Sequence, residues 1–278
     1  MALDKVADRV YADVTGDNGG NYGAIVLDDE IVMVDSGMMH LKSAVARDFL
    51  VNKFGLPIKK ILLTHHHSDH VLGAQAFEPV SFISSSKTRE ICEEALEGRW
   101  SDEELRGWAE EAKETRPDLW ESFQTLRVLI PDVTFDKEIR IHDDVVFRHM
   151  GGHTVGSSIV ILEPEHVLFI GDLLFNKSFP YAGDNSCDPN RWISGLEEIL
   201  SDDYEIVVPG HGPLCGSQGI IDQLEFLKNF RDLIRGAIEE GLTSKQFLDE
   251  KRTPDYYLED AEHRLKVSVE HWFAYFEG

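Results

Sequence analysis

Seven side chains of metal-binding types lie in four short segments of the chain. The segments are THHHSDH (residues 64–70), GGHT (151–154), GD (171–172) and PGHG (209–212). Each comes at or shortly after the end of an apolar run, and short β-branched and aromatic runs bounded by Gly and Pro are typical of buried strands. Layered α/β folds tend to place their sites beyond the carboxyl ends of strands. The sequence therefore predicts one metal centre, with the candidate ligands His65, His67, Asp69, His70, His153, Asp172 and His211.

Local geometry assigns three histidines to a first ion. In an extended segment, residues i and i+2 point to the same side. His65 and His67 can therefore bind one ion together, and His66 must point away from it. His153 follows two glycines, which let the backbone come close to the site, so we expect it to complete the first set.

The remaining ligands suit a second ion. Asp69 and His70 follow a turn at Ser68, so they can diverge from the first pair and join His211. A short helix predicted at 71–77 would fix this turn, and its N-terminus favours Asp69 as an anion. Asp172, at the end of a strand, is the natural bridging carboxylate, and each ion keeps an open position for a shared water. The other histidines are expected on the surface or in structural roles: His40, His66, His142, His149, His166, His263 and His271.

The order of strands and helices predicts sheets that are covered by helices on both sides. We expect one domain over residues 1–278, with a helical insertion at about 87–127 and a mostly helical tail at about 217–278. Strands are predicted at 10–14, 22–27, 31–35, 60–64, 80–84, 133–135, 138–141, 145–149, 158–162, 166–170 and 205–208, and further helices at 41–54 and 190–200.

The composition excludes several classes of partner. The formal net charge of -24, from 51 acidic and 27 basic residues, argues against nucleic acid and anionic lipid. The same charge is expected of a soluble surface or of a salt-adapted source. The start of the chain has no apolar region of a secretory signal, and no stretch is long enough to cross a bilayer. Three widely spaced cysteines do not suggest a disulfide framework, so we expect a cytoplasmic protein without a membrane partner.

From residue 23 to residue 216, the chain resembles the metallo-β-lactamase superfamily. The HHHSDH run, the three further ligand segments and VDSG (residues 34–37) carry the resemblance. It implies a four-layer αββα sandwich of two mixed β-sheets flanked by helices. It also implies zinc sets of His65, His67 and His153, and of Asp69, His70 and His211, with Asp172 bridging. Asp35 resembles a support for the histidine loop, with a turn-forming Asp at a strand end as the alternative interpretation.

The residue at the bridging position narrows the choice of branch within the superfamily. A carboxylate there, Asp172, is similar to the glyoxalase II-like and lactonase-like branches, whereas true β-lactamase branches usually have Cys or Ser. Lactonases commonly place Tyr three residues later, where this chain has Phe175. The basic residues with which the glyoxalase II tail holds glutathione have no recognisable match after His211. We therefore expect the glyoxalase II-like branch and leave its thioester substrate open.

These residues predict a dinuclear metal-dependent hydrolase for a small ester, thioester or lactone. A hydroxide that bridges the two ions would attack the carbonyl carbon, and Asp69 would be the catalytic residue that orients it and passes its proton to the leaving group. Zinc is expected, with iron or manganese as alternatives. Weak β-lactam hydrolysis is compatible with this chemistry. A mononuclear iron persulfide dioxygenase and a non-catalytic binding protein are the competing hypotheses.

The substrate pocket is expected between the helical insertion and the loop after Asp172. Lys177 is a further candidate, for contact with a substrate carboxylate, and the tail leaves a homodimer open. The aromatic candidates for the pocket wall are Trp100, Trp108, Trp120, Phe175, Tyr181 and Trp192, for most of which ordinary packing is the expected role.

Overall fold

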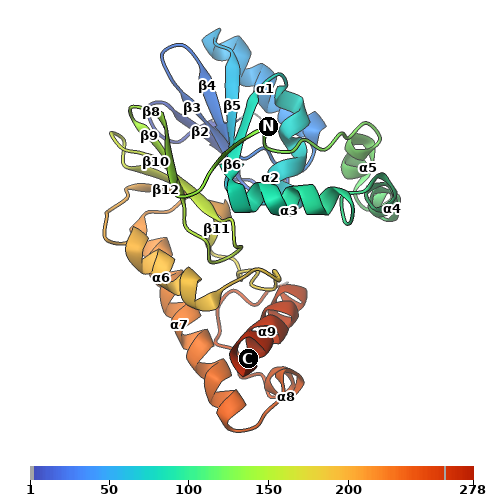
Figure 1. Ribbon diagram of the computed structural model, residues 1–278, viewed down its shortest axis with the longest axis vertical. Coiled ribbons are helices and arrows are strands. Elements are labelled where there is room, and N and C mark those ends of the chain that lie inside the picture. The colour runs from blue at the N-terminus through green and yellow to red at the C-terminus, as the bar shows by residue number, and fades with distance from the viewer. Residues whose placement is uncertain (1–2, 260) are drawn as a thin grey trace.

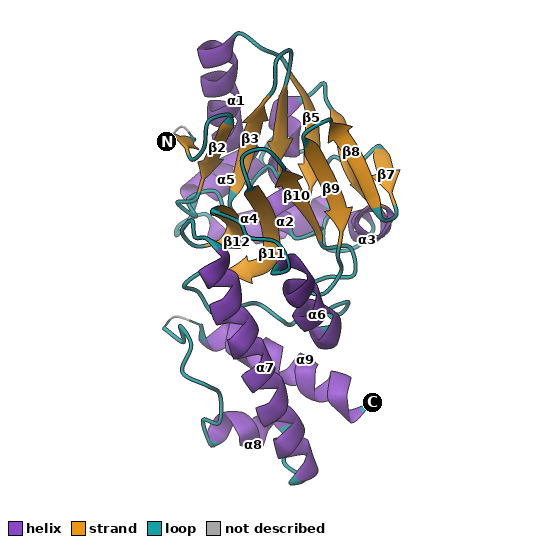
Figure 2. Ribbon diagram, turned by 90° about the vertical axis from the view of Figure 1, so that its left-hand side faces the viewer, coloured by secondary structure: helices purple, strands orange, loops and turns teal. Residues whose placement is uncertain are grey.

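Two mixed β-sheets pack face to face in the computed structural model, which describes residues 3–259 and 261–278 (Figures 1 and 2). In the first sheet, strands β1 to β4 are antiparallel and β4 to β7 are parallel. In the second sheet, only the β11–β12 pair is parallel. The first sheet has the order β1 (Asp4–Lys5), β2 (Val10–Asp13), β3 (Tyr22–Val26), β4 (Ile31–Val34), β5 (Ile58–Leu63), β6 (Ser81–Ser85) and β7 (Val133–Phe135). The second has the order β12 (Ile206–His211), β11 (Val167–Phe175), β10 (Ser158–Leu162), β9 (Val145–His149) and β8 (Glu138–His142).

Helices cover the outer faces of both sheets. The first sheet is covered by helices that precede β7, and the second by helices that follow β11. On the first sheet these are α1 (His40–Phe54), the 3-10 helix η1 (Leu72–Phe77) and α3 (Ser86–Leu96), whereas α4 (Asp102–Ala112) and α5 (Pro117–Phe123) pair with one another and project from the sandwich (Figure 1). On the second sheet they are α6 (Pro189–Ile199) and α7 (Ser217–Glu239), whereas α9 (Glu262–Glu277) packs against α7, and α8 (Ser244–Asp249) against α9, beyond the sheet (Figure 1). The architecture is the predicted αββα sandwich, which is thereby confirmed.

The alternation of side chains along each strand explains why the sheets form a sandwich. Successive residues of a strand point to opposite faces. In β4, Val32 and Val34 lie in the core between the sheets, whereas Ile31 and Met33 pack under the helices of the first sheet. Strand β10 follows the same rule, with every residue buried. Because both faces of these strands are apolar, each sheet must be covered on both sides.

The predicted elements that carry the ligands differ from the structure in three places. Strand β12 does not end at residue 208 but continues to His211. Strand β11 does not end at Ile170 but continues to Phe175, with register irregularities around Gly171. The apolar run in the sequence ends before Gly171 and Asp172, so the prediction stopped there. The helix after the histidine loop begins at Ser68 rather than Val71, as the short α2 (Ser68–Val71), so Asp69 lies in its first turn.

No helix among the described residues combines the length and the apolar character that a membrane span requires.

The tail helix α7 holds the strand that carries Asp172. Gln223 is fully buried, and its Oε1 accepts a hydrogen bond of 2.8 Å from the backbone N–H of Phe175. Its Nε2 donates to the carbonyl of Leu173 at 2.6 Å, and the Trp192 indole donates to the same carbonyl at 2.9 Å. The end of β11 therefore depends on side chains from α6 and α7.

We predict that Gln223→Leu destabilises the protein. The substitution leaves the buried N–H of Phe175 without an acceptor, which costs about 1–3 kcal/mol. The free energy of unfolding in urea measures this loss. Gln218→Leu, at an exposed position of the same helix, is the control and should change that free energy by less than about 0.5 kcal/mol. Equal stability of the two variants would contradict the role of Gln223.

Candidate metal centre

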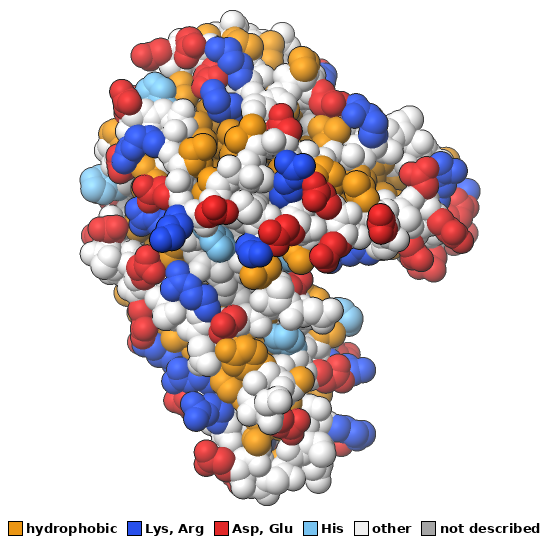
Figure 3. Space-filling model, in the orientation of Figure 1, with side chains coloured by type: hydrophobic (Ala, Val, Ile, Leu, Met, Phe, Trp, Pro, Cys, Tyr) orange, Lys and Arg blue, Asp and Glu red, His pale blue; other side chains and the backbone are white. Residues whose placement is uncertain are grey.

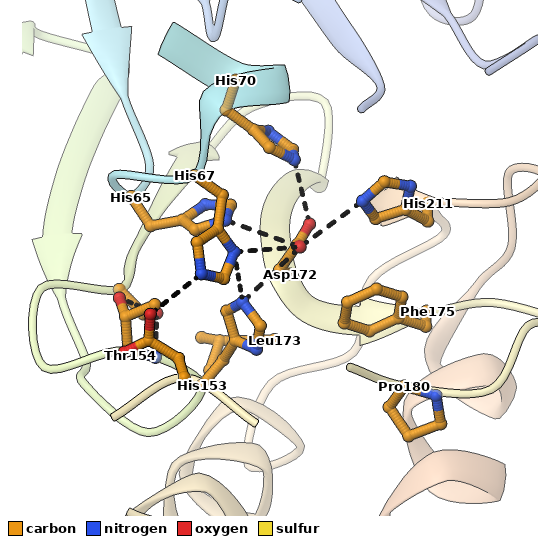
Figure 4. Close-up of polar contacts among 12 residues, drawn as sticks. His65, His67, His70, His153, Thr154, Asp172, Leu173, Phe175, Pro180 and His211 are labelled. Atoms are coloured by element: carbon orange, nitrogen blue, oxygen red, sulfur yellow. Dashed lines mark hydrogen bonds and ion pairs between the residues drawn. The ribbon is translucent and has the colours of Figure 1, made fainter. Parts of the chain in front are cut away.

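The first ligand cluster contains three histidines and one aspartate from three parts of the chain. His65 and His67 follow β5, His153 follows β9, and Asp172 lies in β11. Potential ligand atoms of the four residues all lie within 4.8 Å of one another. The Nε2 atoms of His65 and His153 each lie 3.5 Å from Asp172 Oδ2, and His67 Nδ1 lies 3.1 Å from His153 Nε2 (Figure 4).

The second cluster contains Asp69, His70 and His211, whose ligand atoms also converge within 4.8 Å. His211 Nε2 lies 3.3 Å from Asp69 Oδ2 and 3.4 Å from Asp172 Oδ2. His70 Nε2 lies 3.1 Å from Asp172 Oδ1. The structure therefore brings all seven predicted ligands together, in the two sets that the sequence indicated.

Asp172 belongs to the first cluster and also faces the second. Its Oδ1 faces His70, and its Oδ2 faces His65, His153 and His211 (Figure 4). The expectation that every ligand lies beyond a strand end is wrong for this residue, because β11 continues past it. A side chain at Gly210 would overlap the Asp172 carboxylate, so the neighbouring strand β12 can approach only without a Cβ.

The clusters fit divalent metal ions. Among the described residues, three buried atoms that face one another have no hydrogen-bond partner: His65 Nε2, His70 Nε2 and Asp172 Oδ1. Buried polar atoms normally have such partners, and unpaired ones need an explanation. Imidazole nitrogens around a carboxylate are a ligand set for zinc and similar ions, which would satisfy all three atoms.

A second carboxylate orients two of these histidines. Asp35 Oδ2 accepts hydrogen bonds of 2.8 Å from His70 Nδ1 and from the Thr64 hydroxyl, and its Oδ1 accepts one of 2.7 Å from the Thr64 N–H. Thr64 Oγ1 in turn lies 3.0 Å from His65 Nδ1. Both rings therefore present Nε2 to the centre. Asp35 also has a positive φ of 58° just after β4. It therefore supports the histidine loop and forms the turn at the strand end, as both interpretations of the sequence proposed.

The ligand histidines differ from one another in protonation state. Burial lowers the pKa of His65 well below its usual range and that of His153 to about 3, so both rings are neutral at neutral pH. Burial also acts on His211, but Asp172 and Asp69 outweigh it and raise the pKa to about 9. The pKa of Asp172 is well below its usual range, because the neighbouring histidines outweigh its burial. A cation would replace the proton that His211 otherwise carries.

A cavity of about 520 Å³ opens onto the centre. Phe175 stacks on the His211 ring at a centroid distance of 5.0 Å, and Tyr181 lies edge-on to His67 at 5.6 Å. Trp108 of α4 and Arg264 of α9 also line the cavity. Figure 3 shows the molecule hollowed between the projecting α4–α5 pair and the tail helices.

The structure separates the predicted pocket residues. Trp108, Phe175 and Tyr181 line the cavity. Lys177 lies at a different cavity, so its predicted contact with a substrate carboxylate is not supported. The other three aromatic candidates pack elsewhere: Trp100 is buried and donates to Ser68, Trp120 donates to Glu110, and Trp192 is in the core.

Three functional candidates were missed in the sequence. Arg99, Asp184 and Arg264 line the cavity although none belongs to a recognisable motif. The only available signal was general, since Asp184 lies in the loop after Asp172 and Arg99 lies in the helical insertion. His66 also differs from a surface residue, because it is buried and its Nε2 contacts Asp184.

Comparison with known proteins agrees with this geometry. Residues 15–211 match the model of the metallo-beta-lactamase superfamily. The chain belongs to this superfamily. The described residues contain a His-rich set of potential metal ligands within the matched region.

Curated and solved relatives are distant. The linear primary-alkylsulfatase of Pseudomonas sp. (strain ATCC 19151) is 20% identical over 268 residues, which cover 80% of this chain and 50% of that protein. The chain thus spans about half the length of that relative. TMB-1 has a TM-score of 0.62 at 15% identity and covers 81% of this chain and 96% of its own. The metallo-beta-lactamase from Hirschia baltica has a TM-score of 0.61 at 18% identity, with the same coverage of both chains. At this identity the likeness shows the fold.

We predict that Asp172→Ala reduces the metal content of the protein. Because Asp172 faces both clusters, its loss should lower bound zinc from about two ions per chain to one or none. Metal analysis after dialysis against zinc-containing buffer, by inductively coupled plasma mass spectrometry, measures this change. Asp143→Ala, at an exposed turn of the second sheet, is the control and should keep the wild-type content. Full zinc content in Asp172→Ala would contradict the bridging position.

Proposed function

We propose that the protein is a dinuclear metallohydrolase of the glyoxalase II-like branch that hydrolyses a small ester, thioester or lactone carrying an acidic group. The observation that carries this proposal is the buried Asp172 carboxylate between two ligand clusters, at the floor of a cavity that also contains two arginines. The helical tail supports the assignment to the glyoxalase II-like branch, because its helix α9 contributes Arg264 to that cavity.

The ligand set supports two zinc ions, with iron or manganese as alternatives. His65, His67 and His153 would hold one ion and Asp69, His70 and His211 the other, with Asp172 shared. Such ions lower the pKa of bound water to about 7 and polarise a carbonyl oxygen. The complete second cluster argues against the mononuclear iron dioxygenase, which needs only the first.

Asp69 is the residue best placed to handle a proton. It lines the cavity and is partly exposed, whereas Asp172 is buried. Burial alone would raise the pKa of Asp69, but His70 and His211 outweigh it and lower the pKa, so the carboxylate is ionised at neutral pH. An ionised Asp69 can accept a hydrogen bond from the attacking water and carry its proton toward the leaving group.

Arg99 and Arg264 support a substrate with an anionic group. Within residues 3–259 and 261–278, neither guanidinium has a carboxylate within 4.0 Å. Arg264 is half-buried and donates to Ser178 Oγ at 2.9 Å, and burial lowers its pKa. A partly desolvated guanidinium beside an open cavity favours a carboxylate, phosphate or sulfate of the ligand. This local charge lies inside a protein whose net charge is -24.

A sulfate ester is the second candidate substrate. The alkylsulfatase relative covers 80% of this chain, and two arginines suit a sulfate group. The test is a panel of thioesters, carboxylic esters, lactones, alkyl sulfates and β-lactams with the zinc-loaded protein. Turnover of a carbonyl substrate that Asp172→Ala abolishes would support the proposal. Turnover of alkyl sulfates alone would replace it with the second candidate, and inactivity on the whole panel would contradict both.

We predict that Arg264→Gln selectively weakens the use of acidic substrates. Hydrogen bonds to charged groups contribute about 1.5–3 kcal/mol, so KM for a substrate with a free carboxylate should rise about 10–100-fold. The neutral methyl ester of the same substrate should change little. Lys266→Gln, an exposed cation on the same helix, is the control for net charge. Equal effects of Arg264→Gln on the acidic and neutral substrates would contradict an anion-binding role.

A further inference from the structure

One carboxylate outside the predicted ligand set contacts two adjacent histidines. Asp184 lies in the segment between β11 and α6, and its side chain is largely buried. Its Oδ2 lies 3.1 Å from His66 Nε2 and 3.1 Å from His67 Nε2. An ionised carboxylate only accepts hydrogen bonds, so both ring nitrogens must donate to it.

His67 meets the metal centre with a different nitrogen from the other histidines. Its Nδ1 faces His153 and Asp172, at 3.1 and 3.9 Å, whereas His65, His70, His153 and His211 all direct Nε2 toward the centre. Figure 4 shows this orientation of His67 beside Asp172. A neutral imidazole carries its proton on one nitrogen only, so Nδ1 can ligate an ion only when the proton is on Nε2.

The other oxygen of Asp184 is fixed by its own loop. Oδ1 accepts hydrogen bonds from the Ser186 N–H at 2.8 Å and from the Ser186 hydroxyl at 2.5 Å. The Cys187 N–H donates to the Asp184 carbonyl at 2.9 Å, and His271 of the tail helix α9 contacts the Cys187 carbonyl at 3.0 Å. The carboxylate therefore has no freedom to turn away from the two histidines.

We propose that Asp184 is a positioning residue that selects the tautomer of His67 in which Nδ1 is free to bind the metal. Asp184 accepts a hydrogen bond from the Nε2–H of His67 and thereby fixes the ring plane. A second hydrogen bond, from the Nε2–H of His66 to the same oxygen, holds the carboxylate in place. His66 thus supports the centre from outside, although it points away from it. The inference rests on the metal role of His67 in the proposed function, but on no particular substrate.

The same three residues could in principle form a third ion site, since their ligand atoms lie within 4.8 Å of one another. That arrangement would require His67 to bind ions through both nitrogens and to lose its Nε2 proton. The two accounts therefore differ in the expected number of zinc ions and in the position of one proton.

The decisive variant is Asp184→Asn, which keeps the shape of the side chain. With its NH2 group toward the histidines, two donors face the Nε2 protons. With the amide reversed, the oxygen still faces the Nε2 protons, but the NH2 group then meets the Ser186 N–H, which can only donate. In either orientation a donor faces a donor, and the acceptor of His67 is lost or replaced by a neutral amide oxygen, which binds a donor less strongly than a carboxylate does. Removal of such a partner typically weakens metal binding about 10–100-fold.

Zinc affinity, measured by competition with a chromophoric chelator, tests the proposal. We expect Asp184→Asn to bind zinc at the affected site about 10–100-fold less tightly than the wild type, while circular dichroism shows that the metal-free variant remains folded. Asn185→Ala, at the exposed neighbouring position of the same loop, is the matched control and should leave zinc affinity close to wild type. Wild-type affinity in Asp184→Asn would overturn the proposal.

The tautomer can also be read without any variant. Nitrogen-15 NMR of the histidine side chains in the zinc-loaded wild-type protein should show His67 with its proton on Nε2. A proton on Nδ1, or a third zinc ion that disappears in Asp184→Asn, would overturn the proposal. A wild-type protein that binds zinc but hydrolyses nothing would contradict the proposed function and leave this test intact.

Discussion

A single buried carboxylate, that of Asp172, is the constraint on which the rest of the structure depends. It is only 3% exposed, and its two oxygens face imidazole nitrogens from the histidine loop, from His153 and from His211. A buried anion is costly unless cations or hydrogen-bond donors compensate it. Strands from both sheets must therefore deliver these groups to one point, and the sandwich brings the ends of β5, β9, β11 and β12 there.

The surrounding residues maintain this arrangement from several directions. Asp35 orients His70 directly and His65 through Thr64. Gly210 allows the backbone of β12 to approach the carboxylate. Gln223 of the tail fixes the strand just beyond Asp172. The C-terminal helices thus support the site by holding β11 as well as by contributing Arg264 to the cavity.

The sequence predicted the fold and the convergence of the seven ligands for identifiable reasons. Alternation of apolar residues in strands such as β4 and β10 reports both buried faces directly. The ligands lie in short segments that combine His or Asp with Gly, Ser or Thr next to apolar strands, and metal binding is the main role of such a combination. Asp172 was placed at a strand end because Gly171 interrupts the apolar run, whereas the pairing with β12 continues the strand. Arg99, Asp184 and Arg264 were missed because their role depends on tertiary neighbours far away in the chain, and nothing local distinguishes them.

The central claim is that Asp172 lies between two metal ions. Anomalous X-ray diffraction at the zinc absorption edge, on crystals of the zinc-loaded protein, tests it most directly. The account predicts two peaks separated by about 3.5–4 Å, one beside His65, His67 and His153 and the other beside Asp69, His70 and His211, with Asp172 between them. A single peak in the first cluster, or a second peak beside His66 and Asp184, would contradict it.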